Sequence, residues 1–320
     1  MFDPILVPLD GSPLAECVLP HTRAIAQAYQ AKVNLVRVLD RSQGTETSQL
    51  FDLVNWQINK TGAKLYLEKT SSQLQKAGVR VETTVIEGSV ASSITEFAKG
   101  QKSKLIILSS HGRSGYSQWG ISSVTQKIIF SAPTSVLIIR AQQSPTEEKN
   151  DQFYSRILVP LDGSRRAENV LPMVAIFARY HRSRIHIVHV VRTPEMARQL
   201  PLTPEDQELS NKLVVRNREE AAKYLDQIRQ NSPLDGIDVQ THLLVSDNPP
   251  LALHQLTDQE HIDLVALSAH GYSGNSQWPY GSMVNNFILY SQAPLLIVQD
   301  LPVKDEAIPT EMIPRKLAEQ

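Results

Sequence analysis

The sequence predicts an α/β protein of two tandem doubly wound domains, each with a five-stranded, mainly parallel sheet flanked by helices. Two observations lead to this prediction. The run Ile-Leu-Val-Pro-Leu-Asp-Gly-Ser occurs twice, at 5–12 and at 157–164, and so long an identical match indicates an internal duplication. Within each copy, short apolar runs alternate with segments of helical periodicity, which is typical of parallel sheets with helices on both faces.

The chain length sets the domain organisation. Its 320 residues are enough for two such domains, each with its own core. We place the first domain at 1–142 and the second at 154–300, joined by a charged, proline-containing linker at 143–153. The segment 301–320 is polar with three prolines, and we expect it to be a loosely ordered tail.

In the first copy, Ser12 and Pro13 suit the N-cap and the first turn of a helix after the opening strand, and Pro20 is expected to kink that helix. The polar stretch 40–60 is expected to be irregular, followed by a helix at Ala63–Lys76. The other expected elements are a helix at Ala91–Lys99, a helix after Ser122, and strands at Ile5–Leu9, Val33–Leu39, Val79–Ile86, Leu105–Leu108 and Ser135–Ile139.

The second copy repeats this order and has a kink expected at Pro172. It is longer than the first, and we place the extra residues at 193–210, around the start of a helix at Asp206–Gln230. The other expected elements are helices at Leu251–Thr257 and Met283–Ser291, a strand from Ile157, and strands at Ile185–Val191, Ile237–Val245, Ile262–Leu267 and Leu295–Val298.

Composition narrows the function classes. The formal net charge is −1, from 32 basic and 33 acidic residues, so no basic field favours nucleic acid. The single cysteine, Cys17, excludes an internal disulfide framework and a cysteine-rich metal site. No apolar run approaches the roughly 20 residues that span a bilayer, and the N-terminus lacks signal-peptide features. We therefore expect a cytoplasmic protein that binds neither nucleic acid nor membrane.

A loop of small residues follows the fourth strand of each copy and leads into a helix. In the second copy it contains His270-Gly271 and ends at Gly281-Ser282; the first copy ends at Ser122-Ser123. Free N–H groups and the dipole at a helix start attract anions, and glycines let the backbone approach a ligand closely. Both loops are candidate phosphate sites. The second is better formed, because the β-carbon of Ser122 would crowd a phosphate or restrict φ.

An Asp-Gly-Ser turn follows the first strand of each copy, with Asp10 in the first and Asp162 in the second. The carboxyl ends of parallel strands meet at one edge of a sheet, so turn and loop are expected to lie together where such sheets bind ligands. The carboxylate can accept hydrogen bonds from sugar hydroxyls or from a base edge. The alternative is that it only shapes the turn, as Asp-Gly often does.

These loops resemble the phosphate-binding pattern of the universal stress protein family, which is Gly, two residues, Gly, nine residues, then Gly-Ser or Gly-Thr. The second copy departs from it at Ser268, and the first copy has Ser109 and Ser122 in place of both outer glycines. The resemblance covers nearly the whole chain as two tandem family domains and implies bound ATP, with or without Mg²⁺. The residues that it assigns to the nucleotide are Pro160, Leu161, Asp162, Val190, Leu267, Ser268, His270, Gly271, Gly281, Ser282 and Met283, and in the first copy Asp10, Val38, Gly112, Ser122 and Ser123.

The resemblance also implies how the domains assemble. Family domains pair through their last strands, so the two copies are expected to form an internal pseudo-dimer, and two whole chains can pair in a homodimer. It names no protein partner. Whether the first copy binds nucleotide stays open.

Three functional hypotheses follow. The first is an ATP-binding protein with a regulatory or stress-response role. The second is a nucleotide-free module whose paired domains recruit another protein, and the third is an enzyme, either a slow ATPase or a nucleotidyl transferase. The chain has no Walker A pattern, no Gly-x-Gly-x-x-Gly fingerprint and no evident residue to orient an attacking water. Slow ATP hydrolysis is therefore the most that the sequence supports.

Overall fold

The protein is described by a computed structural model that covers residues 2–40, 49–112, 115, 120–141, 153–194, 203–230, 232–272 and 279–299. The elements of the first half are β1 (Ile5–Pro8), α1 (Pro13–Glu16), α2 (Val18–Tyr29), β2 (Lys32–Leu39), α3 (Gln49–Lys76), β3 (Arg80–Glu87), α4 (Val90–Gly100), β4 (Leu105–Ser109), α5 (Ser123–Ser131) and β5 (Ser135–Ile139). Those of the second half are β6 (Arg156–Pro160), α6 (Arg165–Glu168), α7 (Leu171–His181), β7 (Arg184–Val191), α8 (Pro204–Arg229), a 3-10 turn (Ser232–Leu234), β8 (Val239–Val245), α9 (Pro249–Gln259), β9 (Leu264–Ser268), α10 (Ser282–Tyr290) and β10 (Leu295–Val298).

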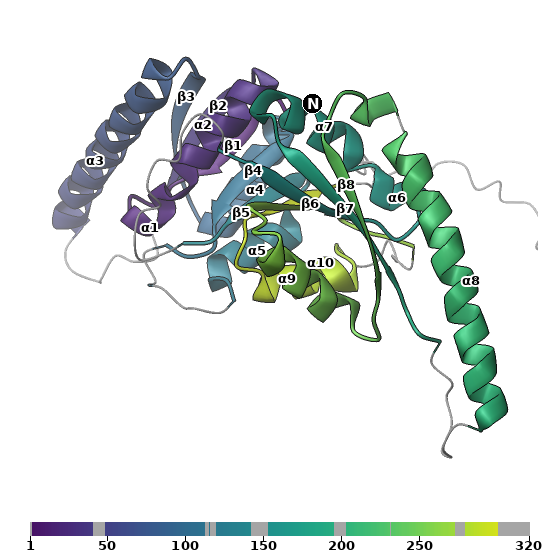
Figure 1. Cartoon of the computed structure of the whole chain (residues 1–320). Helices are drawn as coiled ribbons and strands as arrows, with labels where there is room; N and C mark the ends of the chain where they lie inside the picture. Colours follow the sequence, from purple (N-terminus) through teal and green to yellow (C-terminus); the bar gives the residue numbers. More distant parts are fainter. Residues whose placement is uncertain are drawn as a thin grey trace, which may run out of the picture.

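The strands form one sheet of ten, in the order β3-β2-β1-β4-β5-β10-β9-β6-β7-β8 (Figure 1). Within each half every neighbouring pair is parallel, and the chain order reverses between the first and fourth strands of the half. The predicted fold class is confirmed. The two predicted five-stranded sheets are continuous with each other, because the halves meet edge to edge.

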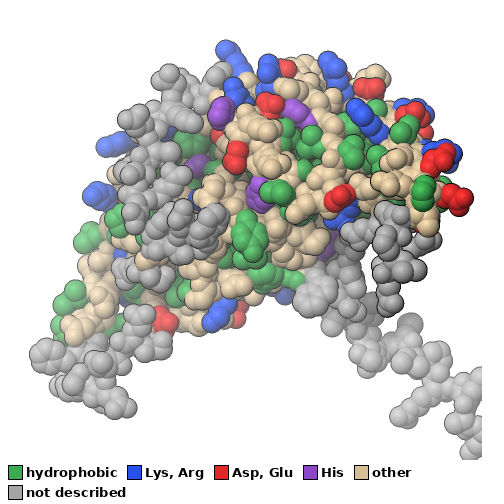
Figure 2. All heavy atoms as spheres, turned by 60° about the horizontal axis from the view of Figure 1, so that its bottom comes forward, with side chains coloured by type: hydrophobic (Ala, Val, Ile, Leu, Met, Phe, Trp, Pro, Cys, Tyr) green, Lys and Arg blue, Asp and Glu red, His purple; other side chains and the backbone are tan. Residues whose placement is uncertain are grey.

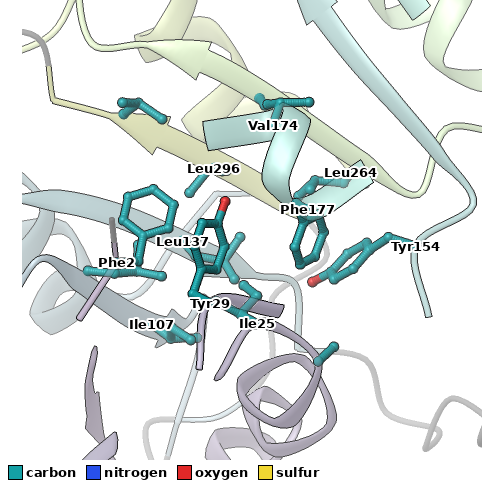
Figure 3. Close-up of a cluster of buried hydrophobic side chains, with 14 of the residues drawn as sticks. Phe2, Ile25, Tyr29, Ile107, Leu137, Tyr154, Val174, Phe177, Leu264 and Leu296 are labelled. Atoms are coloured by element: carbon teal, nitrogen blue, oxygen red, sulfur yellow. The ribbon is translucent and has the colours of Figure 1, made fainter. Parts of the chain in front are cut away.

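The halves meet where β5 pairs antiparallel with β10, with Leu137 opposite Leu296. On one face of this junction α2 packs against α7, and the Tyr29 hydroxyl donates a 2.6 Å hydrogen bond to the carbonyl of Met173. Figure 3 shows aromatic rings from both halves side by side there, with Tyr29 near Phe177. The two halves therefore share one apolar core across the strand junction.

Helices cover both faces of the sheet, as expected for strands that read as uninterrupted apolar runs. Alternate residues of β1 belong to different cores: Ile5 and Val7 pack on one face and Leu6 on the other. The first core takes residues from α1, α2, α3, α6, α7 and α8, and the second takes residues from α4, α5, α9 and α10. The loops after the strands thus lie at the edge between two filled layers.

In place of the kinked helices expected at Pro20 and Pro172, each half has two separate helices. The break lies a few residues before the proline. Proline has no N–H to bond the carbonyl four residues back, so the helix before it cannot continue through that position. Accordingly α1 ends at Glu16 and α6 ends at Glu168, and α2 and α7 start anew, each with its proline in the first turn.

The expectation that 40–60 is irregular is wrong for its second part, because α3 begins at Gln49. Ahead of Ala63, the apolar side chains of Val54 and Ile58 are exposed. Val54 and Ile58 are four residues apart, as on one face of a helix, but the stretch around them is largely polar, which is why only Ala63–Lys76 was expected to be helical.

Two predicted segments fall largely outside the description: the linker 143–153, apart from Phe153, and the tail 301–320. None of the helices in the described ranges combines the length with the apolar composition of a bilayer-spanning segment. Figure 2 shows one face of the surface, on which acidic and basic side chains are interspersed. Such mixing accords with the near-zero net charge of the chain.

Candidate functional site

The predicted site residues of each half lie at the point where the strand order reverses. The strand before Asp162, β6, pairs with β9, which leads into His270-Gly271. In the first half β1 and β4 pair in the same way and precede Asp10 and Gly112. In an open α/β sheet this carboxyl edge is where ligands bind. The fold therefore brings the turn and the loop together in both halves, as predicted.

The aspartate and the glycine of each half are in direct contact. A β-carbon placed on Gly271 would overlap Oδ2 of Asp162, and one placed on Gly112 would overlap Oδ2 of Asp10. Any side chain would displace the carboxylate, so the position after each histidine favours glycine for steric reasons. From the sequence, these glycines were expected to let the backbone approach a phosphate. In the structure, the group for which they leave room is the aspartate carboxylate of the same half.

The carboxylate of Asp162 ties the turn to the loop. Its Oδ1 accepts hydrogen bonds from the backbone N–H of Ser164 at 3.0 Å and from the Ser164 hydroxyl at 2.6 Å. Its Oδ2 accepts one from the N–H of Tyr272 at 2.6 Å. Partial burial raises the pKa of Asp162, but these bonds outweigh it and hold that pKa below its ordinary value. The group is therefore an anion at neutral pH.

The same turn explains the repeated Asp-Gly-Ser. Gly163 has φ of 84°, in the left-handed region that favours glycine. Ser164 caps α6, because its side chain accepts a hydrogen bond from the N–H of Ala167. Asp162 therefore does shape the turn, as the alternative proposed, and it also faces the loop. One role does not exclude the other.

The helix after the loop starts differently in the two halves. In the first half Ser122 is the N-cap of α5, and its hydroxyl accepts a 3.1 Å hydrogen bond from the N–H of Thr125. In the second half Gly281 is the N-cap of α10 and offers no side chain. Helix α5 thus has one first-turn N–H occupied by its own cap, and the N-cap of α10 occupies none.

The backbone at these two positions is the same. Ser122 has φ of −63° and donates its N–H to the carbonyl of Ser110 at 2.8 Å; Gly281 has φ of −71° and donates to Ala269 at 2.9 Å. The expectation that serine would restrict φ is wrong, since neither value lies in the glycine-favoring region. What distinguishes the halves is the hydroxyl and its hydrogen bond.

The serines that replace the first family glycine also differ. In the first half the Ser109 hydroxyl lies 2.9 Å from the Leu14 carbonyl and 2.6 Å from that of His111. In the second half the hydroxyl of Ser268 is buried and has no hydrogen-bond partner among the described residues. A buried polar group without a partner destabilises the fold, so an unpaired hydroxyl calls for an explanation. The hydroxyl of Ser268 is free to bond a ligand beside the loop.

The loop histidines are core residues. His270 is 2% exposed and His111 is 6% exposed. The Nδ1 of His111 lies 3.0 Å from the hydroxyl of Ser110, and burial, helped by the charge of Arg140, lowers the pKa of His111. Their imidazoles are turned into the protein, so only the backbone of each His-Gly pair can contact a ligand.

The other predicted residues form the rim or the floor of the two sites. Leu161 and Leu267 are buried, and the N–H of Leu161 donates to the carbonyl of Val188 at 2.9 Å. Ser282 and its counterpart Ser123 are exposed at the helix starts. The partly buried members of the set are Pro160, Val190, Met283 and Val38.

One position that sequence reasoning missed lies beside each site, just before Val38 or Val190. In the second half His189 places Nδ1 2.9 Å from the Leu161 carbonyl, and burial lowers its pKa, so the ring is neutral. In the first half the guanidinium of Arg37 lies beside Gly11, where it would crowd a β-carbon placed on that glycine. The first turn thus has a cation where the second has a neutral ring. Only a comparison of the two copies at the end of strand two would have signalled this.

Each half also supports the loop of the other. The Tyr280 hydroxyl donates to the carbonyl of Ile129 in α5, and the N–H of Gly120 donates to the carbonyl of Leu289 in α10 at 3.3 Å. Arg140, largely buried, donates to the carbonyls of Phe287 and Ile288. The loops are thus anchored across the junction of the halves.

The fold and these loops define a tandem, doubly wound α/β protein with a small-residue loop and a helix start at the carboxyl edge of each half. The chain belongs to the universal stress protein family, whose sequence profile matches residues 1–140 and 153–299. The family resemblance inferred from the loops is confirmed.

Individual relatives agree with this assignment. The chain is 28% identical over 142 residues to universal stress protein MJ0531 of Methanocaldococcus jannaschii, covering 44% of this chain and 83% of the relative. It is 29% identical over 150 residues to universal stress protein YxiE of Bacillus subtilis, covering 44% of this chain and all of the relative (100%). A solved universal stress protein from Archaeoglobus fulgidus shares the fold over 94% of this chain and 99% of its own, with a TM-score of 0.64 at 17% identity.

Proposed function

We propose that the protein binds ATP at the loop of its second half and acts as a regulatory or stress-response protein, with slow hydrolysis at most. The observation that carries this proposal is the start of α10. Gly281 supplies no capping side chain, so the first-turn N–H groups stay available to a phosphate. In the first half, the hydroxyl of Ser122 takes one of the corresponding groups.

Two further groups suit a nucleotide. The ionised carboxylate of Asp162 can accept about four hydrogen bonds. Three are taken by Ser164 and Tyr272, so it can accept one more from a ribose hydroxyl. The buried hydroxyl of Ser268, which lacks a described partner, can donate to a phosphate oxygen or to its bound water. If Mg²⁺ accompanies the nucleotide, we place it on the phosphates, because Mg²⁺ keeps most of its waters and few protein ligands.

The test compares the wild type with Gly281→Ser, which gives α10 the cap that α5 has. We expect ATP to raise the melting temperature of the wild type and to be released from it as an adenine nucleotide detectable by mass spectrometry. Gly281→Ser should fold normally and lose the ATP-induced shift. Gly100→Ser is the matched control, because a β-carbon on Gly100 meets nothing within 4 Å. A wild type that neither carries nucleotide nor responds to millimolar ATP would exclude the proposal.

The first half supports a different proposal, that it serves as a nucleotide-free scaffold in an internal pseudo-dimer. The Ser122 cap favours this, as does the hydrogen bond from Tyr280 to Ile129, by which the first half holds the loop of the second. Equilibrium binding should then give one ATP per chain. A stoichiometry of two would overturn this part while leaving the second-half site intact.

A further inference from the structure

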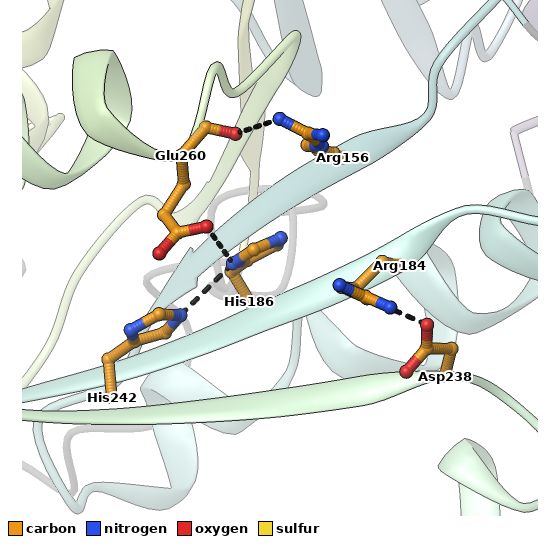
Figure 4. Close-up of polar contacts among 6 residues, drawn as sticks. All are labelled: Arg156, Arg184, His186, Asp238, His242 and Glu260. Atoms are coloured by element: carbon orange, nitrogen blue, oxygen red, sulfur yellow. Dashed lines mark hydrogen bonds and ion pairs between the residues drawn. The ribbon is translucent and has the colours of Figure 1, made fainter.

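A cluster of two imidazoles and one carboxylate lies on the second half, away from the nucleotide loop. His186 of β7 and His242 of β8 stack with their rings 14° from parallel, and Glu260, the C-cap of α9, reaches toward them (Figure 4). Nδ1 of His186 lies 3.0 Å from Nε2 of His242 and 3.8 Å from Oε2 of Glu260. The three potential ligand atoms lie within 4.8 Å of one another.

We propose that His186, His242 and Glu260 bind a divalent transition-metal ion, with Zn²⁺ as the reference ion. Two imidazole nitrogens and a carboxylate oxygen are ligands that Zn²⁺ accepts, and three protein ligands leave the fourth tetrahedral position to water. Ligand atoms around zinc, at about 2.0–2.1 Å from the ion, are a little over 3 Å apart, so small side-chain rotations suffice here. Within the described part of the chain, this is the group of three that the geometry brings together for a metal.

The hydrogen bonding of the cluster also suits an ion. Each neutral imidazole has one nitrogen that donates and one that carries a lone pair, and Nδ1 of His186 and Nε2 of His242 face each other. Nε2 of His186 is buried without a described partner, so this ring makes its polar contacts through Nδ1, the atom that faces His242 and Glu260. Without an ion, one of the two facing nitrogens carries the proton of their hydrogen bond; the other neutral tautomer of that ring frees its lone pair, so that two nitrogens and an anion can face one ion.

The surroundings hold the ligands in place. Arg156 donates a 2.9 Å hydrogen bond to the carbonyl of Glu260 and fixes the end of α9. The other nearby cation, Arg184, is paired at 2.7 Å with Asp238, which reduces its opposition to a bound ion. The His186 side chain is 1% exposed and that of Glu260 is 33% exposed, so one ligand is rigidly packed and the open side faces water.

The first half provides an internal comparison. At the register position of His186 it has Asn34, opposite Leu6 as His186 is opposite Leu158. Thr84 takes the place of His242, and Gln101, the C-cap of α4, that of Glu260. All three positions therefore differ between the copies, and each has a metal-binding residue type only in the second. A role in the shared fold would be met by the same residues in both halves.

The cluster is separate from the proposed nucleotide site. His186 precedes Val190 by four residues on the same strand, which is about 13 Å along it. The ion would join the edge strand β8 to β7 and to the end of α9. This inference does not depend on ATP binding, and the variant Gly281→Ser should keep its metal.

The experiment uses the untagged full chain, stripped with a chelator, titrated with ZnCl₂ by calorimetry and with Co²⁺ by absorption spectroscopy. We expect one ion per chain and a tetrahedral Co²⁺ spectrum. Loss of even an outer-shell partner lowers metal affinity about 10- to 100-fold, so His242→Gln and Glu260→Gln should lose at least as much. His186→Asn, which installs the residue of the first half, should abolish binding.

The matched control is His261→Asn. His261 is exposed beside Glu260, and its φ of 48° is one that Asn tolerates. It should bind Zn²⁺ like the wild type. The proposal is overturned if micromolar Zn²⁺ does not bind the wild type, or if the His242→Gln variant binds it equally well. His242 is only partly buried, so this variant should fold. The first outcome leaves a hydrogen-bonded histidine pair, and the second places the ion elsewhere.

Discussion

The hydroxyl of Tyr280 donates a 2.9 Å hydrogen bond to the backbone carbonyl of Ile129, which belongs to the other half of the chain. Tyr280 is 3% exposed, and burial raises its pKa, so the hydroxyl keeps its proton. Because Tyr280 directly precedes Gly281, the last helix of the first half positions the start of α10. The proposed site of one half therefore depends on the other.

Replacing Tyr280 with Phe tests this dependence. The carbonyl of Ile129 keeps its bond from Ala132, so the loss should be about 0.5–1.5 kcal/mol of unfolding free energy, the net value of one hydrogen bond. ATP affinity should fall as well, because the loop loses its anchor. Urea unfolding and calorimetric titration measure the two effects. Tyr290→Phe is the control, since Tyr290 is 53% exposed; unchanged ATP affinity in Tyr280→Phe would contradict the coupling.

A single methyl group at Gly271 should disrupt the second site. Its β-carbon would overlap Oδ2 of Asp162, so the carboxylate must move and give up the N–H of Tyr272. We expect a loss of about 1–3 kcal/mol in stability, as for other overpacked sites, and loss of the ATP-induced thermal shift. Gly62→Ala provides the comparison, because nothing lies within 4 Å of its β-carbon. A Gly271→Ala protein with wild-type ATP response would refute this role of the contact.

The cap of α5 should contribute to stability without contributing to ATP binding. Ser122→Ala removes the acceptor of the Thr125 N–H and should cost about 0.5–2 kcal/mol. Ser123→Ala, at the next and exposed residue, should cost little. Chemical denaturation separates the two. An equal loss in both variants would show that the hydroxyl of Ser122 is not the cap.

Acid should weaken the second turn through Asp162. Its pKa is lower in the folded chain than in the unfolded chain, so its contribution is fully present above the unfolded pKa and is lost as pH falls through the folded pKa. Asp162→Asn removes this titration, and stability should then decline less steeply below about pH 4. Denaturant midpoints across that range test it. A variant with the same acid slope as the wild type would show that other carboxylates account for the slope.

The sheet was predictable because its signal is local. Strands such as β5, buried at every residue, read as short apolar runs. The repeated Asp-Gly-Ser marks a turn whose central residue has a positive φ, which glycine adopts readily. Helix α3 was predicted too short because Val54 and Ile58, although four residues apart, lie in a largely polar stretch and face water.

The site was predictable only as a set of segments. Loop residues were placed by strand order, but the contact of Asp162 with Gly271 joins residues far apart in the chain, and no spacing reveals it. The cap by Ser122 was expected to act through φ and acts through its hydroxyl instead. The cluster of His186, His242 and Glu260 gave no sequence signal, because three separate elements bring it together.

The antiparallel pairing of β5 with β10 occurs inside one polypeptide. Its formation is therefore first-order, and dilution cannot separate the partners. Two identical subunits must change together whenever their gene changes. In two linked copies each copy can change on its own, so that different residues at equivalent positions, such as Ser122 and Gly281 or Asn34 and His186, occur in a single assembly.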